Sequence, residues 1–359
     1  MIDRPTIEIY EGAAEHYRDA RGGDPVAAAA FAEPLPKGTI RLDLGCGPGL
    51  DLEGLGRPTV ALDAAMPMLR LVAPDAWRVQ ADVAALPFRR GAAGAAWSSK
   101  CHQHLRHEQL PLALAELHRV LAVGAPLSLR VFHAAGSPEP GSRSDDDLPG
   151  RWFSWWAPDR LTDVVVGAGF DIDDVVVGDA GEQGVGLLTV RATRARTLAD
   201  TVGPGMRLLF CGLNPSIYAA DAGLGFARPG NRFWPAAREA GVVTVDRDPV
   251  AALVRDGVGM TDLVKRASVG ADEVGREEYE RGMGRLERLS AWLRPAALCF
   301  VGLAGWRALV DRRSAPGWQE ATVGGCPAYL APSTSGRNAS SQIDDLIAHF
   351  RAALRPPTG

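Results

Sequence analysis

The sequence contains no apolar run that approaches the roughly 20 residues of a membrane-spanning helix. Its five cysteines are scattered, with neither CxxC pairs nor the spacing typical of zinc sites. Iron–sulfur clusters and structural zinc are therefore disfavoured, and we expect buried, reduced thiols and no metal. The N-terminal stretch carries acidic residues and no apolar segment of a signal peptide, so we expect a cytoplasmic protein without a membrane partner.

A strong positive charge is also missing. Lysine is scarce, and the formal net charge of the 359 residues is −4. Neither half of the chain is a basic arm, so charge alone does not predict nucleic-acid binding. At about 150 residues per domain, the length predicts two domains. We place them at residues 1–195 and 205–359, with residues 196–204 as the linker.

Strands and helices alternate along both halves. This pattern predicts an α/β fold with two domains, each a mostly parallel sheet flanked by helices. A helical lead-in covers residues 1–37. The strands expected in the first half, with their turns, are 39–47, 59–65, 77–83, 91–99, 125–132, 171–179 and 186–195. Those expected in the second half are 207–213, 297–303 and 327–332, before a last helix at 340–354.

A glycine-rich turn follows the first expected strand. Gly45, Gly47 and Gly49 allow the backbone to turn tightly and to approach a ligand. Asp63 and Asp82 stand at the ends of the next two strands, where one carboxylate can accept two ribose hydroxyls and the other an adenine amino group. Either acid alone is more typical of a turn, but all three features together favour a ligand site.

Residues 10–193 resemble the class I S-adenosylmethionine-dependent methyltransferases, through DLGCGPG at 43–49, LPF at 86–88 and the unit HRVLAVGAPL. The resemblance implies a Rossmann-like methyltransferase fold with S-adenosylmethionine as cofactor. It assigns cofactor binding to Asp43, Gly45, Cys46, Gly47, Gly49, Asp63, Asp82 and Val83. No Asn/Asp-Pro-Pro-Tyr motif follows the fourth strand, so methylation of an exocyclic base nitrogen is not supported. The Ala- and Gly-rich fourth strand leaves open a degenerate domain that binds cofactor poorly.

Two polar or aromatic clusters in this half have competing interpretations. His102, His104 and His107 could be metal ligands, but no carboxylate pattern completes such a site, and we favour polar residues that line the cofactor pocket. The aromatic run at residues 151–156 could stack on bases. We favour instead a cover over the pocket before the next helix.

The second half contains an amide at the end of a strand. The apolar segment 208–211 runs into Gly-Leu-Asn-Pro-Ser, and the proline holds the backbone of Asn214. An asparagine is no base, but its carbonyl oxygen can orient a water toward an electron-poor carbon, such as the sugar cation formed when a glycosidic bond breaks. A purely structural turn is the alternative interpretation.

Two loops favour the chemical interpretation. Phe226 lies in a glycine-rich loop that can place its ring against a flat ligand. The loop 331–339 offers small hydroxyls and backbone N–H groups suited to phosphates, and Arg337 at its tip could enter a duplex where a base has left. The alternative for this loop is a flexible cap for the last helix.

Residues 203–355 resemble the mismatch-specific uracil/thymine-DNA glycosylase branch of the uracil-DNA glycosylase superfamily, through CGLNPS, GFARPGNRFW, GMTDLVKRAS and PSTSGRN. The resemblance implies a uracil-DNA-glycosylase-like α/β/α fold and double-stranded DNA with a mispaired or damaged pyrimidine as partner. Asn214 would position the attacking water and Phe226 would stack on the flipped base. The backbone from Leu213 to Ser216 would support the leaving base. The DNA contacts implied are Ser333, Thr334, Ser335, Gly336, Arg337 and Asn338.

This half departs from its relatives in ways that imply slow turnover. Ser216 stands where many relatives have glycine, the final loop lacks a histidine, and no aspartate stands beside Asn214 as a base. We expect uracil opposite guanine, and exocyclic cytosine adducts, to be better substrates than thymine, with no cofactor for this domain. Binding should be sensitive to salt.

Two other functions remain open at this point. The methyltransferase could be the main activity, with the second domain serving nucleic-acid binding. The first domain could instead be a non-enzymatic module that senses the cofactor or serves as a scaffold. We expect a monomer, and the methyl acceptor is undefined.

Overall fold

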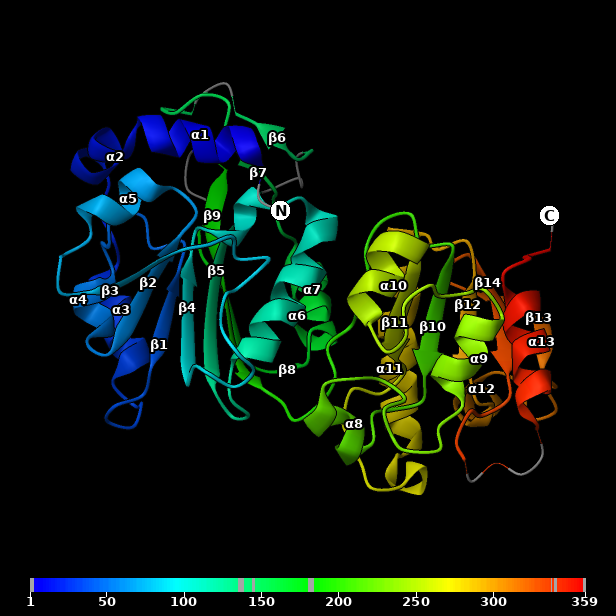
Figure 1. Cartoon of the computed structure of the whole chain (residues 1–359). Helices are drawn as coiled ribbons and strands as arrows, with labels where there is room; N and C mark the ends of the chain where they lie inside the picture. Colours follow the sequence, from blue (N-terminus) through cyan, green and yellow to red (C-terminus); the bar gives the residue numbers. More distant parts are fainter. Residues whose placement is uncertain are drawn as a thin grey trace. The chain divides into compact units, whose positions relative to one another are not determined.

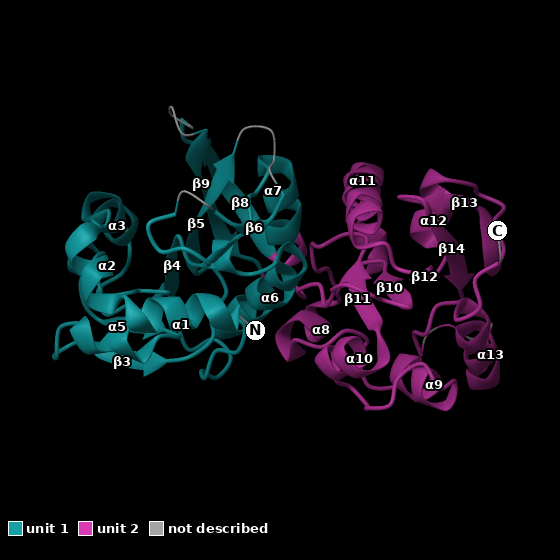
Figure 2. Ribbon diagram, turned by 90° about the horizontal axis from the view of Figure 1, so that it is seen from above, with its two compact units in different colours: residues 1–166, 170–195 teal, residues 167–169, 196–359 magenta. Residues whose placement is uncertain are grey.

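A computed structural model describes residues 3–134, 139–143, 146–179, 184–336, 338 and 341–357. The chain divides into two compact units (Figure 2), residues 1–166 with 170–195 and residues 167–169 with 196–359. Residues 196–204, expected as the linker, fall in the second unit, where Thr197, Asp200 and Val202 are buried. Within the described residues, no helix has the length and apolarity needed to cross a membrane.

The first unit is built on a seven-stranded sheet in the order β3-β2-β1-β4-β5-β9-β8 (Figure 1). The first five strands pair in parallel, whereas β9 is antiparallel to β5 and to β8. Because β1 is buried along its whole length, its side chains form the centre of the core. The strands are Arg41–Leu44 (β1), Thr59–Asp63 (β2), Trp77–Gln80 (β3), Ala95–Ser99 (β4), Pro126–Ala134 (β5), Phe170–Val177 (β8) and Val185–Arg194 (β9).

The helices of this unit begin with the expected lead-in. The carboxylate of Asp3 accepts from the N–H of Thr6 at 3.2 Å, which caps the first helix. The helices are Arg4–Gly12 (α1), Ala14–Ala20 (α2), Pro25–Ala32 (α3), Leu52–Leu55 (α4), Met66–Leu71 (α5), Leu110–Val120 (α6) and Pro158–Gly167 (α7). Two short 3-10 turns, His102–His104 (η1) and His107–Gln109 (η2), follow β4. A small ribbon joins Gly141–Ser142 (β6) to Trp152–Phe153 (β7).

The second unit has a five-stranded sheet in the order β11-β10-β12-β14-β13 (Figure 1). Four strands are parallel, and β13 is antiparallel to β14. The strands are Leu208–Gly212 (β10), Val258–Asp262 (β11), Leu298–Val301 (β12), Gly317–Val323 (β13) and Cys326–Ala331 (β14). The helices are Ile217–Ala222 (α8), Phe233–Glu239 (α9), Pro249–Asp256 (α10), Arg276–Leu293 (α11), Ala304–Leu309 (α12) and Ile343–Ala353 (α13).

An aromatic cluster fills the core beside β10. The ring of Phe210 lies 4.9 Å from that of Phe233 and 5.0 Å from that of Phe350, in edge-on arrangements. These contacts hold α9 and α13 on the sheet.

The predicted α/β fold with two mostly parallel sheets is confirmed. Strands β11 and β13 were not among the expected ones, and β11 proves important for the site.

Candidate functional site

The glycine turn of the first unit packs closely against the segment that follows β4. Gly45 has a φ of +68°, and a Cβ atom built on it would lie 2.4 Å from Sγ of Cys101. Only glycine tolerates both the backbone conformation and this approach. The turn therefore brings Gly45 and Gly47 into the lining of a pocket.

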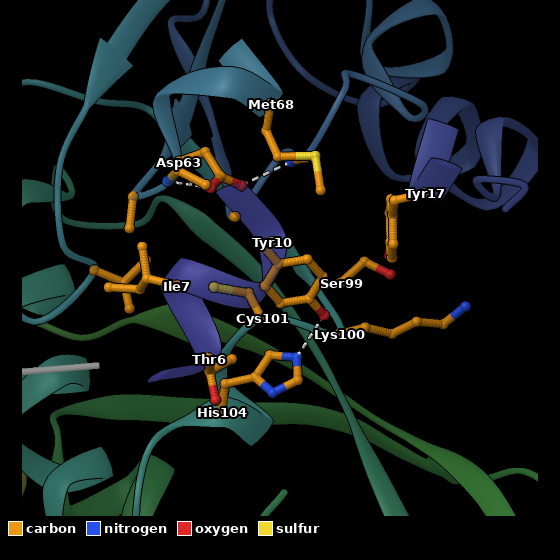
Figure 3. Close-up of a pocket in the computed structure, with 15 residues that line it drawn as sticks. Thr6, Ile7, Tyr10, Tyr17, Asp63, Met68, Ser99, Lys100, Cys101 and His104 are labelled. Atoms are coloured by element: carbon orange, nitrogen blue, oxygen red, sulfur yellow. Dashed lines mark hydrogen bonds between the residues drawn. The ribbon is translucent and has the colours of Figure 1, made fainter. Parts of the chain in front are cut away.

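This pocket has a volume of about 600 Å³ including its open mouth (Figure 3). Tyr10 of α1 and Tyr17 of α2 form one part of the lining, and Asp63, Val83 and Lys100 form others. The helical lead-in is thus part of the site.

Asp63 is held in a fixed orientation at the end of β2. Its Oδ2 accepts from the N–H of Gly47, and its Oδ1 from the N–H of Ala65, each at 2.8 Å. Burial raises the pKa of Asp63, although these backbone bonds oppose the rise. Each carboxylate oxygen keeps a further lone pair, so the group can still accept from two adjacent hydroxyls. The residues present therefore fit the ribose of S-adenosylmethionine.

The other predicted cofactor residues lie around the pocket in different ways. Val83 lines it, whereas Asp43, Cys46, Gly49 and Asp82 lie outside its lining. Asp43 is only 3% exposed, and burial raises its pKa well above the ordinary value. The carboxylate of Asp82 accepts from the N–H of Ala84 at 2.9 Å, so one of its roles is to shape the local turn.

Of the three histidines, His104 lines the pocket. Its Nδ1 lies 2.6 Å from the carbonyl of Trp152, which can only accept, so Nδ1 carries the proton. Its Nε2 therefore accepts from the hydroxyl of Tyr10 at 3.0 Å (Figure 3). Burial lowers the pKa of His104 to about 4, so the ring is neutral at physiological pH. Arg151 donates to the same hydroxyl at 2.9 Å.

The remaining histidines and the aromatic run have internal partners. His102 lies 2.7 Å from Oγ of Ser98, and His107 lies 2.7 Å from the carbonyl of Trp155. Across the described parts of the chain, no group of three His, Cys, Asp or Glu side chains could hold a metal. Phe153 and Trp155 are buried and stack on each other at 5.9 Å. Most of the run therefore packs inside the unit, and Trp152 is its partly exposed member.

In the second unit, the side-chain amide of Asn214 is oriented by a loop that follows β11. Its Nδ2 donates to Oγ of Ser268 at 2.7 Å and to the carbonyl of Arg266 at 3.1 Å. Because a carbonyl can only accept, Nδ2 must face Arg266 and Oδ1 must point the other way. Among the described residues, Oδ1 has no hydrogen-bond partner, so it can accept from a water.

A carboxylate lies on the neighbouring strand at the same edge of the sheet. Gly212, the last residue of β10, is paired in register with Asp262, the last residue of β11. A Cβ atom on Gly212 would lie 2.4 Å from Oδ1 of Asp262 and 3.7 Å from Cζ of Phe226. The glycine is therefore required for the carboxylate and the ring to approach the end of β10. Burial raises the pKa of Asp262 to about 6, while Lys265 and Arg285 oppose the rise.

Asp262 was not among the site residues expected from the sequence, because it is remote from Asn214 in the chain. The parallel register of β10 and β11 brings the segments of Asn214 and Asp262 together. Hydrogen bonds between these two segments continue beyond the ends of the strands. The N–H groups of Leu263 and Val264 donate to the carbonyls of Gly212 and Leu213, each at 2.9 Å. The sequence signal for Asp262 was the short apolar segment 258–262, which ends in this aspartate.

Phe226 presents a rigid ring beside Gly212. It stacks on Phe233 with ring centroids 4.0 Å apart and planes 12° from parallel. Its φ of +58° is unusual for a non-glycine residue, and such strain concentrates at functional sites. Phe233 is fully buried, so it fixes the position of the partly exposed Phe226.

The segment from Leu213 to Ser216 leads from β10 into α8. Leu213 is partly buried, and Ser216 is the N-cap of α8, where its hydroxyl accepts from the N–H of Ala219 at 3.2 Å. This serine therefore has a structural role in addition to any contact with a base. The segment is also tied to Ser268, whose N–H donates to Pro215 O at 3.1 Å.

The predicted DNA-binding loop follows β14. Thr334 is 2% exposed, and its carbonyl accepts from the N–H of Arg232 at 3.0 Å. Ser333 and Ser335 are partly buried, Gly336 is exposed, and Asn338 donates to the carbonyl of Ser333 at 2.8 Å. Arg337 lies outside the described residues.

Family models match both parts of the chain. The model of the uracil DNA glycosylase superfamily matches residues 199–355, and that of a methyltransferase domain matches residues 42–129. Among solved structures, a methyltransferase from Burkholderia thailandensis that acts on 1,6-didemethyltoxoflavin is 19% identical, with a TM-score of 0.44, over 53% of this chain and 87% of that one. Two S-adenosylmethionine-dependent methyltransferases are also similar. The protein from Methanosarcina mazei is 16% identical, with a TM-score of 0.40, over 46% of this chain and 97% of that one. The protein from Mesorhizobium loti is 20% identical, with a TM-score of 0.39, over 48% of this chain and 97% of that one.

Proposed function

The chain joins a methyltransferase domain to a domain of the uracil DNA glycosylase superfamily, and from this premise we propose that it excises mispaired or damaged pyrimidines from DNA. The substrate would be uracil opposite guanine, with ethenocytosine and thymine as further candidates. The base would be flipped out of the duplex, its N-glycosidic bond hydrolysed, and an abasic site left behind. Glycosylase and methyltransferase are the activity classes that the two domains support.

The orientation of Asn214 is the observation that carries this proposal. Ser268 and Arg266 take up its amide N–H groups, which leaves Oδ1 to accept from a water. A water held in this way can attack the sugar cation that forms once the bond to the base has stretched. The amide itself needs no change of protonation state, which suits a dissociative transition state.

Asp262 would contribute a negative charge to the same step. Above about pH 6 its carboxylate is ionised, at the end of the strand next to that of Asn214. An ionised carboxylate there would stabilise the sugar cation and accept a proton from the attacking water. The water's oxygen would form the new bond to the sugar carbon, and the base would leave with the bonding electrons.

Phe226 and the backbone that follows β10 would hold the flipped base. The ring of Phe226 is held against Phe233 and would stack on the pyrimidine. Backbone N–H groups between Leu213 and Ser216 would donate to the oxygen that gains charge as the base leaves. The loop 333–338 would contact phosphates, and Arg337 would fill the gap beside the unpaired guanine.

In the first unit, the pocket beside Asp63 would bind S-adenosylmethionine, which supplies an electrophilic methyl group when bound. Asp63 would accept from the ribose hydroxyls, and Gly45 and Gly47 would let the methionine end approach the backbone. Methyl transfer is a second candidate activity, because Tyr10, whose hydroxyl is held by His104 and Arg151, lines the same pocket and could orient an acceptor there. Calorimetric titration with S-adenosylmethionine tests whether the pocket binds the cofactor.

Single-turnover cleavage of a labelled duplex with one G·U pair tests the glycosylase. We expect Asn214→Ala to lose abasic product while it still binds a duplex with a tetrahydrofuran abasic-site analogue opposite guanine. Ser268→Ala, which removes only one support of the amide, should give an intermediate rate. If the wild-type protein cleaves none of the G·U, G·T or ethenocytosine duplexes, the glycosylase proposal is refuted.

A further inference from the structure

One arginine side chain joins the start of α9 to the loop that follows β14. Arg232 is the N-cap of α9, and its guanidinium donates from NH2 to the carbonyls of Ser335 at 3.0 Å and Asn338 at 2.8 Å. Its NH1 donates to the carbonyl of Ser341. These three carbonyls lie on both sides of position 337 in the chain.

The geometry of these bonds depends on the planar guanidinium. A single NH2 group holds two carbonyls, and NH1 holds a third, because the five N–H donors of arginine are arranged in a rigid fork. The Nε atom of Arg232 is buried and has no hydrogen-bond partner within the described parts of the chain. The orientation of the group is therefore set by the loop carbonyls alone.

Further contacts restrict the same loop. The backbone N–H of Asn338 donates to the carbonyl of Ser335 at 2.9 Å. A Cβ atom on Gly336 would lie 2.8 Å from the carbonyl of Gly230, so the loop packs on the segment just before Arg232. The loop is thus braced against residues 230–232 at several points.

We propose that Arg232 is a positioning residue for DNA recognition, which holds Ser335, Asn338 and Ser341 in the arrangement that contacts the duplex. This inference rests on the proposed glycosylase function and extends it to a residue that touches neither the base nor the reacting atoms. The next residue, Phe233, supports Phe226 from behind. The start of α9 therefore fixes both the base-stacking ring and the DNA-binding loop relative to each other.

The same geometry separates binding from chemistry. Asn214 is oriented by Ser268 and Arg266, which belong to the segment after β11. The guanidinium of Arg232 donates instead to Ser335, Asn338 and Ser341. Loss of Arg232 should therefore weaken binding of the duplex and leave the rate at saturating protein nearly unchanged. A residue with a merely structural role would lower both through partial unfolding.

The test measures duplex affinity and the saturated cleavage rate for Arg232→Ala, Arg232→Lys and a matched control, Arg238→Ala. Arg238 is exposed on the same helix, so its removal takes away the same charge without touching the loop. The probes are a G·U duplex and a duplex with tetrahydrofuran opposite guanine. We expect Arg232→Ala to weaken both affinities at least about tenfold, which is about 1.4 kcal/mol, with the saturated rate within about threefold of wild type. Arg232→Lys should fall in between, and Arg238→Ala should remain near wild type.

Chemical rescue gives a second readout. Guanidinium ion at millimolar concentration should restore part of the affinity of Arg232→Ala, whereas sodium chloride at the same ionic strength should not. The inference is overturned if both Arg232 variants bind as tightly as the wild type, if they match Arg238→Ala, or if the saturated rate falls as much as the affinity. Should Arg232→Ala not fold, Arg232→Lys decides by the same criteria. A wild-type protein that binds neither duplex would refute the proposed function itself, a result distinct from all of these.

Discussion

Replacement of Asp262 by asparagine should raise stability and lower activity, and both effects should depend on pH. Burial raises the pKa of this carboxyl from 3.8 to about 6. The folded state then binds the proton more tightly than the unfolded state. The protonated carboxyl of Asp262 therefore makes its full contribution to the free energy of unfolding below about pH 4, and this contribution is lost as the pH rises through 6. A shift of about two units at 1.36 kcal/mol each gives roughly 3 kcal/mol as an upper bound on the destabilisation at pH 8.

Denaturant unfolding of the wild type and of Asp262→Asn at pH 4 and at pH 8 measures this effect. The variant should be more stable by up to about 3 kcal/mol at pH 8, and the two proteins should be nearly equal at pH 4. Asp246→Asn, at an exposed position, is the control and should show no such crossover. Single-turnover cleavage of a G·U duplex should rise with pH through about 6 in the wild type. In the variant it should be independent of pH over this range and at least about 100-fold slower at pH 8.

Two results would refute this reasoning about Asp262. A variant that is less stable than the wild type at pH 8 would show that the carboxylate is stabilised by its neighbours rather than destabilised by burial. A variant that keeps the wild-type rate and pH profile would remove Asp262 from the reaction.

Three further changes have defined outcomes. Gly212→Ala forces a methyl group to within 2.4 Å of the Asp262 carboxylate, so it should cost about 1–3 kcal/mol in chemical denaturation and slow cleavage, and unchanged values would contradict the close approach. Phe226→Ala removes the stacking surface and should weaken G·U duplex binding about 10- to 100-fold in a titration, and an unchanged affinity would remove Phe226 from base stacking. Asp63→Asn should weaken S-adenosylmethionine binding at least tenfold in calorimetry, since an amide accepts at only one of its two atoms, and equal affinity would remove Asp63 from the ribose site.

The sequence predicted the elements whose signals are local. The glycine turn at residues 45–49 and the strand that ends before Asn214 both follow from short-range rules on glycine, proline and apolar runs. Strand β11 was missed because its five residues carry a short apolar pattern that does not distinguish a strand from a helix turn. Without β11, nothing places Asp262 next to Gly212.

Side-chain partners were the other gap, because they depend on contacts between distant segments. Tyr10 meets His104 across 94 positions, and Arg232 meets the loop carbonyls across more than 100. A local pattern could not reveal either pair. The histidines of residues 102–107 show how far a local pattern reaches. The sequence predicted that they line the cofactor pocket, and the structure places His104 in that lining but pairs His102 with Ser98.

The two sites share a structural principle that explains why a glycine stands at the carboxyl end of β1 and of β10. In the first unit, Gly45 follows β1 and allows Cys101, from the segment after the adjacent strand β4, to cross close to its backbone. In the second unit, Gly212 ends β10 and allows Asp262 of the adjacent strand β11 to do the same. A side chain at either glycine would occupy the volume that the neighbouring strand's residue needs. The glycines therefore do more than turn the chain, because they make room for a side chain from a neighbouring segment: the thiol of Cys101 beside the pocket of the first unit and the carboxylate of Asp262 beside the end of β10.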